Sequence, residues 1–173
     1  MAQVAVIFDG AVVGGVTVPD PEWNRAVAIV GDVRTASKTR EAVAVAKLLQ
    51  AGLACASPTH ESHDVVVTIA GDRLPADIKT LFPSFDARQV GTSAAVQEDI
   101  VAKIDSEVLK ENRQGTICLF DLSYLSTAVR QGVVGGIHNL YPTAITLEYD
   151  FLNAQLHVIR PTKFEFHRGN WYH

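Results

Sequence analysis

The sequence predicts one α/β domain over residues 1–173, with a mostly parallel central sheet, two main helices, an N-terminal β-hairpin and a C-terminal antiparallel three-stranded meander. Three observations predict this class. In the middle of the chain, apolar runs that suit buried strands alternate with helical patterns. Near the N-terminus an Asp-Gly pair joins two β-rich runs, and the last third alternates apolar with polar residues. A chain of 173 residues is also close to the size of one ordinary domain.

The first predicted element is a hairpin over "QVAVIFDGAVVGGVTV", residues 3–18. Asp9 and Gly10 stand between its two apolar runs, and this dipeptide favours a tight two-residue turn. Asp9 is therefore interpreted as a turn residue. Because apolar side chains occur on both faces of the runs, we expect the hairpin to be covered on both sides.

A strand, a helix and a second strand are predicted next. "RAVAIVGDV" predicts a buried strand over about 25–31. Ser37 suits the N-cap of the following helix, and Gly52 suits its C-terminal cap. "DVVVTIAG", residues 64–71, then predicts a strand parallel to the first, joined to it by a right-handed crossover.

The same pattern repeats further along the chain. "LPADIKTLF", residues 74–82, predicts a short helix, and "DARQV", residues 86–90, a short strand. Apolar residues that recur every four positions predict a long helix from Ser93 to about Arg113. "TICLF", residues 116–120, follows as another buried strand.

The last third predicts the meander. "TAITLEYDFL" alternates apolar with polar residues, and "AQLHVI" and "KFEFH" continue this period of two. Asn153-Ala154 and Pro161-Thr162 suit the turns between the three strands. One face of this meander is expected to be exposed to solvent.

Composition restricts the function classes. Apolar residues make up 47% of the chain and charged residues 20%. This composition is slightly more apolar than is usual for a soluble monomer, so we expect the excess apolar surface to be buried. The net charge of −4 makes nucleic acid an unlikely partner. Cys55 and Cys118 lie among apolar residues and are interpreted as small buried hydrophobes. Without a signal-peptide pattern or a long apolar run, the sequence predicts no membrane partner, and a location in the cytoplasm or in a particle assembled there.

Three aspartates form the candidate catalytic set. If the central sheet is parallel, its predicted strands end at Asp32, Asp72 and Asp121, and ligands bind beyond the carboxyl ends of such strands. Three converging carboxylates would suit Mg²⁺ and phosphoryl transfer. The alternative is structural, because Asp is common where strands stop and helices begin.

Two of the apolar segments resemble parts of the PIN and NYN nucleases, in which strands end in aspartates. "VAVIFDG" and "VVVTIAGD" are the segments that carry this resemblance. The resemblance implies a metal-dependent nuclease. The acidic residue that usually follows "GD" in those nucleases is replaced here by Arg73-Leu74, and Asp9 stands in a hairpin signal. The resemblance therefore does not identify a family.

Two further motifs each have a structural alternative. "GDVRTASKT", residues 31–39, is similar to a phosphate-binding loop, with Lys38 and Thr39 at the start of a helix, but it lacks the second glycine of that pattern. A capped helix start explains the same residues. "HESHD" places His60 and His63 three positions apart, which would suit zinc only with further ligands, such as His138, His157 or His167 from distant segments. A polar loop before a strand is the preferred interpretation of these residues.

The preferred interpretation is a non-enzymatic structural or assembly subunit of a larger complex, such as a virion or another multiprotein particle. We expect homo-oligomers or neighbouring subunits as partners and no cofactor. The expected interface residues are Val12 and Val13 of the hairpin with Trp171 and Tyr172 of the aromatic C-terminal end, and the apolar segment "VVGGI", residues 133–137, adds support. The alternative is a metal-dependent phosphoryl-transfer enzyme or nuclease that uses the three aspartates and Mg²⁺.

Overall fold

The structure, a computed structural model, is mixed α/β and divides into two compact units, Met1–Ile78 and Lys79–His173. It describes residues 1–59, 63–69, 71–82, 92–111, 117–140, 144–150, 155–159, 166–167 and 170–171. Side chains are described over 1–59, 63–69, 71–82, 92–107 and 117–134 and at Thr146. The sequence predicted a single domain, and each of the two units is considered by itself below.

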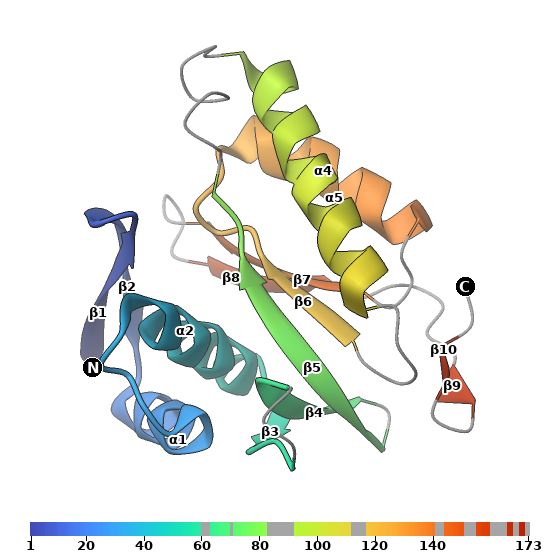
Figure 1. The fold of residues 1–173 in the computed structure, drawn as a ribbon. Helices are drawn as coiled ribbons and strands as arrows, with labels where there is room; N and C mark the ends of the chain where they lie inside the picture. The colour runs from blue at the N-terminus through green and yellow to red at the C-terminus, as the bar shows by residue number, and fades with distance from the viewer. Residues whose placement is uncertain are drawn as a thin grey trace. The chain divides into compact units, whose positions relative to one another are not determined.

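The first unit contains a hairpin, two helices and a set of antiparallel strands (Figure 1). Strand β3 pairs with β4 and β4 with β5, both in antiparallel register. Strand β5 continues past the end of this unit into the second. The elements are β1 (Ala2–Phe8), β2 (Ala11–Val18), α1 (Asp20–Val30), α2 (Ala36–Gln50), β3 (Ala54–Ala56), β4 (Val65–Ile69) and β5 (Asp72–Thr80).

Helix α1 corrects the prediction of a strand over 25–31. The helix begins with Asp20 and Glu22 in its first turn and a proline at its start, and all three favour a helix N-terminus. It ends at Gly31, whose φ of 85° forms a left-handed cap and whose N–H donates to Val27 O at 2.8 Å. These end signals outweigh the apolar content of the segment, so no parallel strand precedes α2.

Helix α2 confirms the helix that was predicted after residue 37, although its cap differs. Thr35, and not Ser37, is the N-cap, and its Oγ1 accepts the Lys38 N–H at 3.2 Å. At the other end Gly52 has a φ of 85°, as a C-terminal cap requires. All eight residues of the range 42–49 are buried, so the helix is covered around its whole circumference.

Strand β5 corrects the prediction of a helix over 74–82. A two-residue turn that contains Gly71, with φ of 86°, joins β4 to β5 and places Ile69 opposite Asp72. Leu74 and Ala76 are fully buried two positions apart, which is the strand period. Pairing with β4 therefore decides the conformation of a segment whose proline was interpreted as a helix start.

The second unit is built around a parallel crossover. Strand β6 pairs with β7 in parallel register through the intervening helix α5, and β7 pairs with β8 in antiparallel register. The strand pairs with a described register include the parallel pair β6–β7 and the antiparallel pairs β3–β4, β4–β5 and β7–β8, so the mostly parallel sheet is not confirmed. The elements are α4 (Ser93–Glu111), β6 (Ile117–Asp121), α5 (Thr127–Leu140), β7 (Ala144–Asp150), β8 (Gln155–Ile159), β9 (Phe166–His167) and β10 (Asn170–Trp171).

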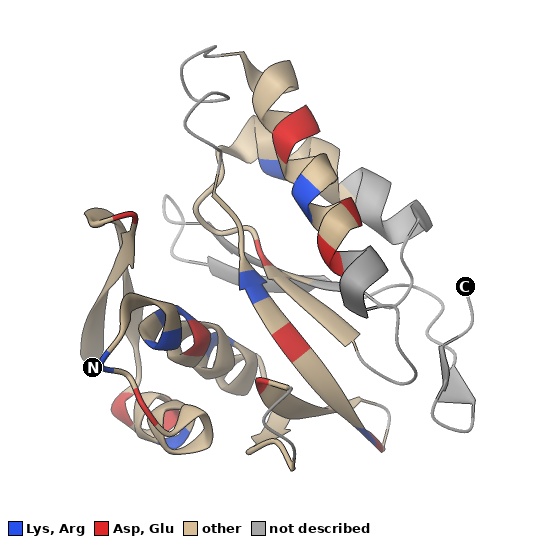
Figure 2. Cartoon of the chain, viewed as in Figure 1, with Lys and Arg blue, Asp and Glu red and all other residues tan. Residues whose placement is uncertain are grey.

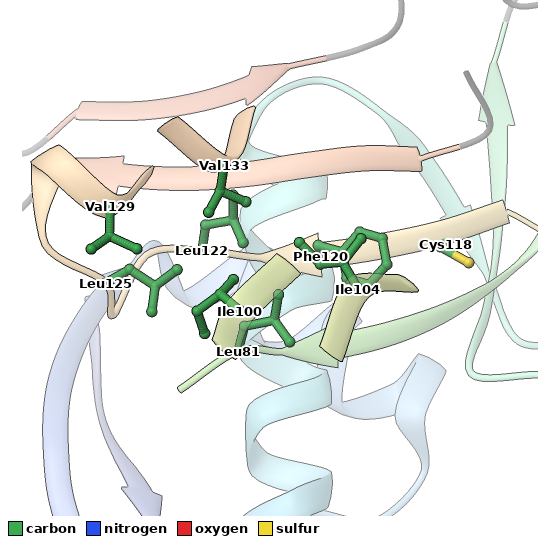
Figure 3. Close-up of a cluster of buried hydrophobic side chains, with 9 residues drawn as sticks. All are labelled: Leu81, Ile100, Ile104, Cys118, Phe120, Leu122, Leu125, Val129 and Val133. Atoms are coloured by element: carbon green, nitrogen blue, oxygen red, sulfur yellow. The ribbon is translucent and has the colours of Figure 1, made fainter. Parts of the chain in front are cut away.

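The core of the second unit lies between α4, α5 and one face of β6 (Figure 3). Helix α4 confirms the long helix predicted from Ser93, and its Thr92 Oγ1 accepts the Ala95 N–H at 3.2 Å at the helix start. Strand β6 confirms the predicted buried strand. The core side chains are Leu81, Ile100, Ile104, Cys118, Phe120, Leu122, Leu125, Val129 and Val133.

Helix α5 was not predicted, and it contains residues 133–137, the apolar segment that was taken to support the assembly interpretation. Ser126 caps the helix, because its Oγ accepts the Val129 N–H at 3.4 Å and its carbonyl accepts the Arg130 N–H at 2.9 Å. Val133 is fully buried and Val134 packs against the same core. Val133 and Val134 therefore contribute core contacts, and the side chains of residues 135–137 lie outside the described set.

The predicted three-stranded meander is not confirmed, although β7 and β8 pair in antiparallel register. The third predicted strand contains Phe166–His167, which pair with Asn170–Trp171 in a two-stranded sheet of their own. The short strand predicted over 86–90 lies outside the described residues. The two predicted turns of the meander, at 153–154 and 161–162, also lie outside them.

Candidate functional site

The N-terminal hairpin is the part of the described chain that presents large apolar side chains to solvent. The predicted turn is confirmed, because Asp9 and Gly10 have φ of 55° and 78° and join Phe8 to Ala11. An irregularity in the β1–β2 register lies between Val6 and Ile7. Such a bulge bends the strands and increases their twist near the turn.

The two faces of the hairpin differ sharply in burial. Val6, Val16 and Val18 are at most 2% exposed and form its inner face. On the outer side and at the bulge, Val12 is 68% exposed and Ile7 and Val13 are each 37% exposed. The expectation that both faces are covered is therefore wrong for the single chain, because only the inner face has cover.

Helix α2 holds the hairpin near its turn. Arg40 Nη1 donates to the Ile7 carbonyl at 2.5 Å, and the Arg40 guanidinium lies 5.9 Å from the centroid of the Phe8 ring. At the other end of the hairpin the Met1 ammonium pairs with Asp20 of α1 at 3.0 Å. The exposed valines are therefore carried by a strand pair that is attached to helices at both ends.

The hairpin surface is almost uncharged. Apart from Asp9 in the turn, the two strands carry no acidic or basic side chain, as Figure 2 shows by their uniform tan colour. An uncharged strand edge with exposed valines is a template for pairing with another strand. Of the other predicted interface residues, Trp171 lies in β10 with its side chain outside the described set, and Tyr172 lies outside the described residues.

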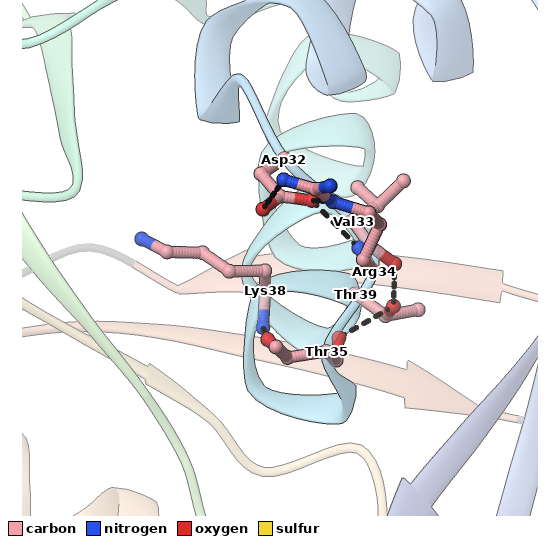
Figure 4. Close-up of polar contacts among 6 residues, drawn as sticks. All are labelled: Asp32, Val33, Arg34, Thr35, Lys38 and Thr39. Carbon is pink, nitrogen blue, oxygen red and sulfur yellow. Dashed lines mark hydrogen bonds and ion pairs between the residues drawn. The ribbon is translucent and has the colours of Figure 1, made fainter.

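Asp32, the first candidate catalytic residue, lies in the loop between α1 and α2 and not at the end of a strand. Its carboxylate accepts hydrogen bonds from Arg34, from the backbone N–H at 2.9 Å and from Nε at 3.1 Å (Figure 4). The side-chain hydrogen bond from Arg34 is the main reason that the pKa of Asp32 lies below its ordinary value. The carboxylate is exposed and already neutralised by a neighbour.

The loop that resembles a phosphate-binding motif is a capped helix start. The Thr39 hydroxyl is a hydrogen-bond donor, and its Oγ1 lies 3.0 Å from the Val33 carbonyl oxygen and 2.9 Å from the Thr35 carbonyl oxygen. The Lys38 side chain extends away from these hydroxyls (Figure 4) and its Nζ pairs with Glu41 at 2.9 Å. The loop also follows a helix, whereas the phosphate-binding motif follows a strand. The structural alternative therefore explains the side chains of Thr35, Lys38 and Thr39 in the motif.

Glu41 is a largely buried carboxyl at the start of α2. Its side chain is only 15% exposed. Burial raises the pKa of Glu41 above its ordinary value of 4.5, and the hydrogen bond from Lys38 opposes that rise. Lys38 in turn has a raised pKa, mainly because it donates to Glu41. The pair is a local structural contact at the first turn of α2.

Asp72 does not lie beside Asp32. It is the first residue of β5, at the turn of the β4–β5 hairpin. Asp64 lies at the opposite end of β4, and the charges of both Asp64 and Asp32 act on Lys38. Strand β4 spans roughly 17 Å at the usual rise per residue. Asp32 and Asp72 therefore belong to different parts of the fold, the α1–α2 loop and the β4–β5 turn.

Asp121, in the second unit, is the one candidate that ends a strand of a parallel pair. It is 1% exposed, and its Oδ1 accepts the Ser123 N–H at 3.1 Å and the Ser123 hydroxyl at 2.5 Å. Arg130 Nη1 donates to the Ser123 carbonyl at 3.5 Å and Nη2 to Thr127 Oγ1 at 3.3 Å. These hydrogen bonds stabilise the turn between β6 and α5, so the Asp121 carboxylate has a structural role.

A metal site is not formed by the side chains that the structure describes, where no three His, Cys, Asp or Glu groups gather closely enough to hold an ion. His63 Nδ1 lies 3.7 Å from Asp77 Oδ1, which is an ion-pair distance. His60 lies outside the described residues, as do the side chains of His138, His157 and His167. The Mg²⁺ and zinc interpretations stay hypotheses.

Both cysteines are free, and burial raises the pKa of Cys55 to about 11, so its thiol is unreactive at neutral pH. No described helix has the length and apolar content needed to cross a membrane. Comparison of the chain with protein-family models, curated proteins and solved structures finds no match.

Proposed function

We propose that this chain is a non-enzymatic subunit of a larger protein assembly and that its N-terminal hairpin is the docking surface. The observation that carries the proposal is the exposure of Val12 beside Ile7 and Val13 on a strand pair that is held in place by its neighbours. Single exposed apolar residues are ordinary on protein surfaces, whereas a contiguous group on an uncharged strand edge favours an interaction site.

The patch has the features of an interface centre. Interface centres are depleted of charged residues and contain well-ordered apolar side chains. Full burial of one valine contributes about 1.5 to 3 kcal/mol relative to leaving it exposed. Val12 is more than half exposed and can gain most of that amount on docking. The three side chains and the backbone groups of a strand edge together suit a specific contact of moderate strength.

Helix α2 limits the entropy cost of docking. The Arg40 contacts to Ile7 and Phe8 hold the hairpin near its turn. A binding element that is already ordered loses less conformational freedom when a partner binds. This support distinguishes the hairpin from a loose terminal strand, which would have to be ordered by its partner.

The test compares the full-length chain with Val12→Asp in lysate of the cells that make the protein. The expected result is that the wild-type chain elutes from size exclusion in a complex larger than the monomer and that Val12→Asp elutes as a monomer. Ala94→Asp is the matched control, because it adds the same charge at an exposed position in the first turn of α4. Both variants should keep the wild-type melting temperature. A monomeric wild-type chain, or a complex that Val12→Asp leaves intact, would contradict the proposal.

A further inference from the structure

We propose that the partner at the hairpin is a second copy of this chain, bound by antiparallel pairing of β2 with β2 around a twofold axis. The result is a continuous four-stranded sheet with the order β1, β2, β2 of the second copy and β1 of the second copy. This inference rests on the proposed function, because it names the partner of the same surface.

The outer edge of β2 presents backbone groups that suit such pairing. In an antiparallel pair, residues that exchange hydrogen bonds with the partner strand alternate with residues whose N–H and C=O point away. A two-residue turn is closed by a pair of the bonded type, here Phe8 and Ala11. Counting from that pair through the bulge, Val12, Gly15 and Thr17 direct their backbone groups away from β1. All three residues are exposed.

Burial supports this count independently. Side chains alternate in step with the backbone groups, so the residues of outward-facing pairs should share one face. Gly15 and Thr17 are exposed, while Val16 and Val18 between and beyond them are buried. The exposed face and the outward-facing backbone groups therefore belong to the same residues of β2.

The edge of β1 is less suitable, because α2 already occupies part of it. The Ile7 carbonyl, which belongs to the outward-facing set of β1, accepts the Arg40 guanidinium. An incoming strand at this edge would have to displace Arg40 and its contact with Phe8. Among the described strands β2 pairs only with β1, so no described strand occupies its outer edge.

The chemistry of β2 favours an identical strand as the occupant. Its sequence "AVVGGVTV" contains no charged residue and no proline, which are the usual protections of a strand edge. Like charges opposite each other destabilise a strand pair, and two copies of this strand place none opposite each other. A twofold pairing also extends a two-stranded sheet, which is marginal alone, to four strands.

The first arm of the test measures the mass of the purified full-length chain by light scattering over a series of concentrations. The expected mass is twice the chain mass of 18.7 kDa, and it should fall to that of one chain in Thr17→Pro. Proline at this position removes an outward-facing N–H and leaves the bonds to β1 in place. Thr17→Ala, which keeps the N–H, should remain dimeric. Both variants should melt within a few degrees of the wild type.

The second arm maps the contact with a single cysteine. Gly15 lies near the middle of β2, which is where the twofold axis falls if the two copies pair along the whole strand, and a Cβ there would meet only the Val4 carbonyl oxygen, at 3.9 Å. A short bismaleimide should therefore join two Gly15→Cys chains in high yield. The native thiols should react slowly, because Cys118 is buried and Cys55 has a raised pKa.

The outcomes separate this inference from the proposed function. A purified chain that is monomeric at all concentrations and does not cross-link at Gly15→Cys would overturn self-pairing. If that chain still joins a large complex in lysate through Val12, the partner is a different protein and the proposed function stands. A dimer that survives Thr17→Pro would also overturn the inference, because it would use another surface.

Discussion

Strands β2 and β6 are both apolar in sequence, but the chain buries them to different extents. All five residues of β6 are buried. In β2 only Val16 and Val18 are buried, while the Val12 side chain is 68% exposed. Both strands consist mostly of apolar residues, but their neighbours differ. β6 pairs with β7 and packs against two helices, whereas β2 pairs with β1 and is covered on one face.

This difference shows where apolar surface remains for a partner. An apolar strand inside a fold is explained by the fold, since its burial stabilises the chain itself. An apolar strand whose outer face stays in water contributes less to the folded state of the single chain. The hairpin is therefore the part of the described chain whose sequence is best explained by a contact outside it.

The largest expected effect is on β6. Phe120 is fully buried in the core between α4 and α5, and Phe120→Ala should lower the free energy of unfolding by about 3 to 5 kcal/mol. Urea denaturation monitored by circular dichroism measures it. A loss under about 1 kcal/mol would mean that β6 is not packed as described, and the contrast with β2 would disappear.

A second comparison lies within β2 itself. Val16→Ala should cost about 2 kcal/mol, because its side chain is 2% exposed and two methyl groups leave a cavity. Val12→Ala removes the same atoms from an exposed position, so its cost should be within about 0.5 kcal/mol. Both values come from urea curves at concentrations where the chain is monomeric. Equal costs at the two positions would show that the hairpin has no distinct inner and outer face.

The start of α2 gives a smaller effect that distinguishes a helix cap from a phosphate site. Thr35→Ala removes the side-chain acceptor of the Lys38 N–H and should cost about 1 kcal/mol. Millimolar phosphate should leave the melting temperature of the wild-type chain unchanged. A rise with phosphate that Thr35→Ala abolishes would instead support anion binding at this loop.

The smallest effects are expected from two carboxyls in this region, with opposite signs. Because the pKa of Glu41 is raised, this group stabilises the folded state at low pH. That stabilisation is lost as the pH rises from 4.5 through the pKa of the folded state. The lowered pKa of Asp32 means that its contribution is present above 3.8 and is lost as the pH falls. The free energy of unfolding should be measured against pH. Glu41→Gln should remove the decrease seen as the pH rises above 4.5, and Asp32→Asn should remove the decrease seen as the pH falls below 3.8. Changes of the same sign in both variants would refute the assigned causes.

The sequence was sufficient for elements that carry strong local signals. Asp9-Gly10 specifies the hairpin turn, and the four-residue spacing of Ile100 and Ile104 specifies α4. It was misleading where an apolar run had signals of two kinds. In α1 the end signals at Asp20 and Gly31 mattered more than the apolar run between them. Both end signals are visible in the sequence.

The remaining errors come from long-range pairing. Segment 74–82 becomes a strand because β4 pairs with it, and no local pattern reports that partner. Helix α5 contains three glycines, which weaken its intrinsic propensity, and packing of Val129 and Val133 against the core compensates. The candidate set of three aspartates depended on three parallel strand ends. Only Asp121 stands at such an end, so the geometry assumed for the set does not follow from the observed topology.

The central claim, that the outer edge of β2 is a docking surface, is tested most directly by amide hydrogen exchange at Val12, Gly15 and Thr17. These amides face away from β1 and should exchange quickly in a monomer, because nothing but water would accept their hydrogen bonds. In the assembled wild-type protein we predict that they are protected at least tenfold relative to the Val12→Asp variant, while the amides that face β1 stay unchanged. Equally fast exchange at all three amides in the assembled protein and in the variant would contradict the claim.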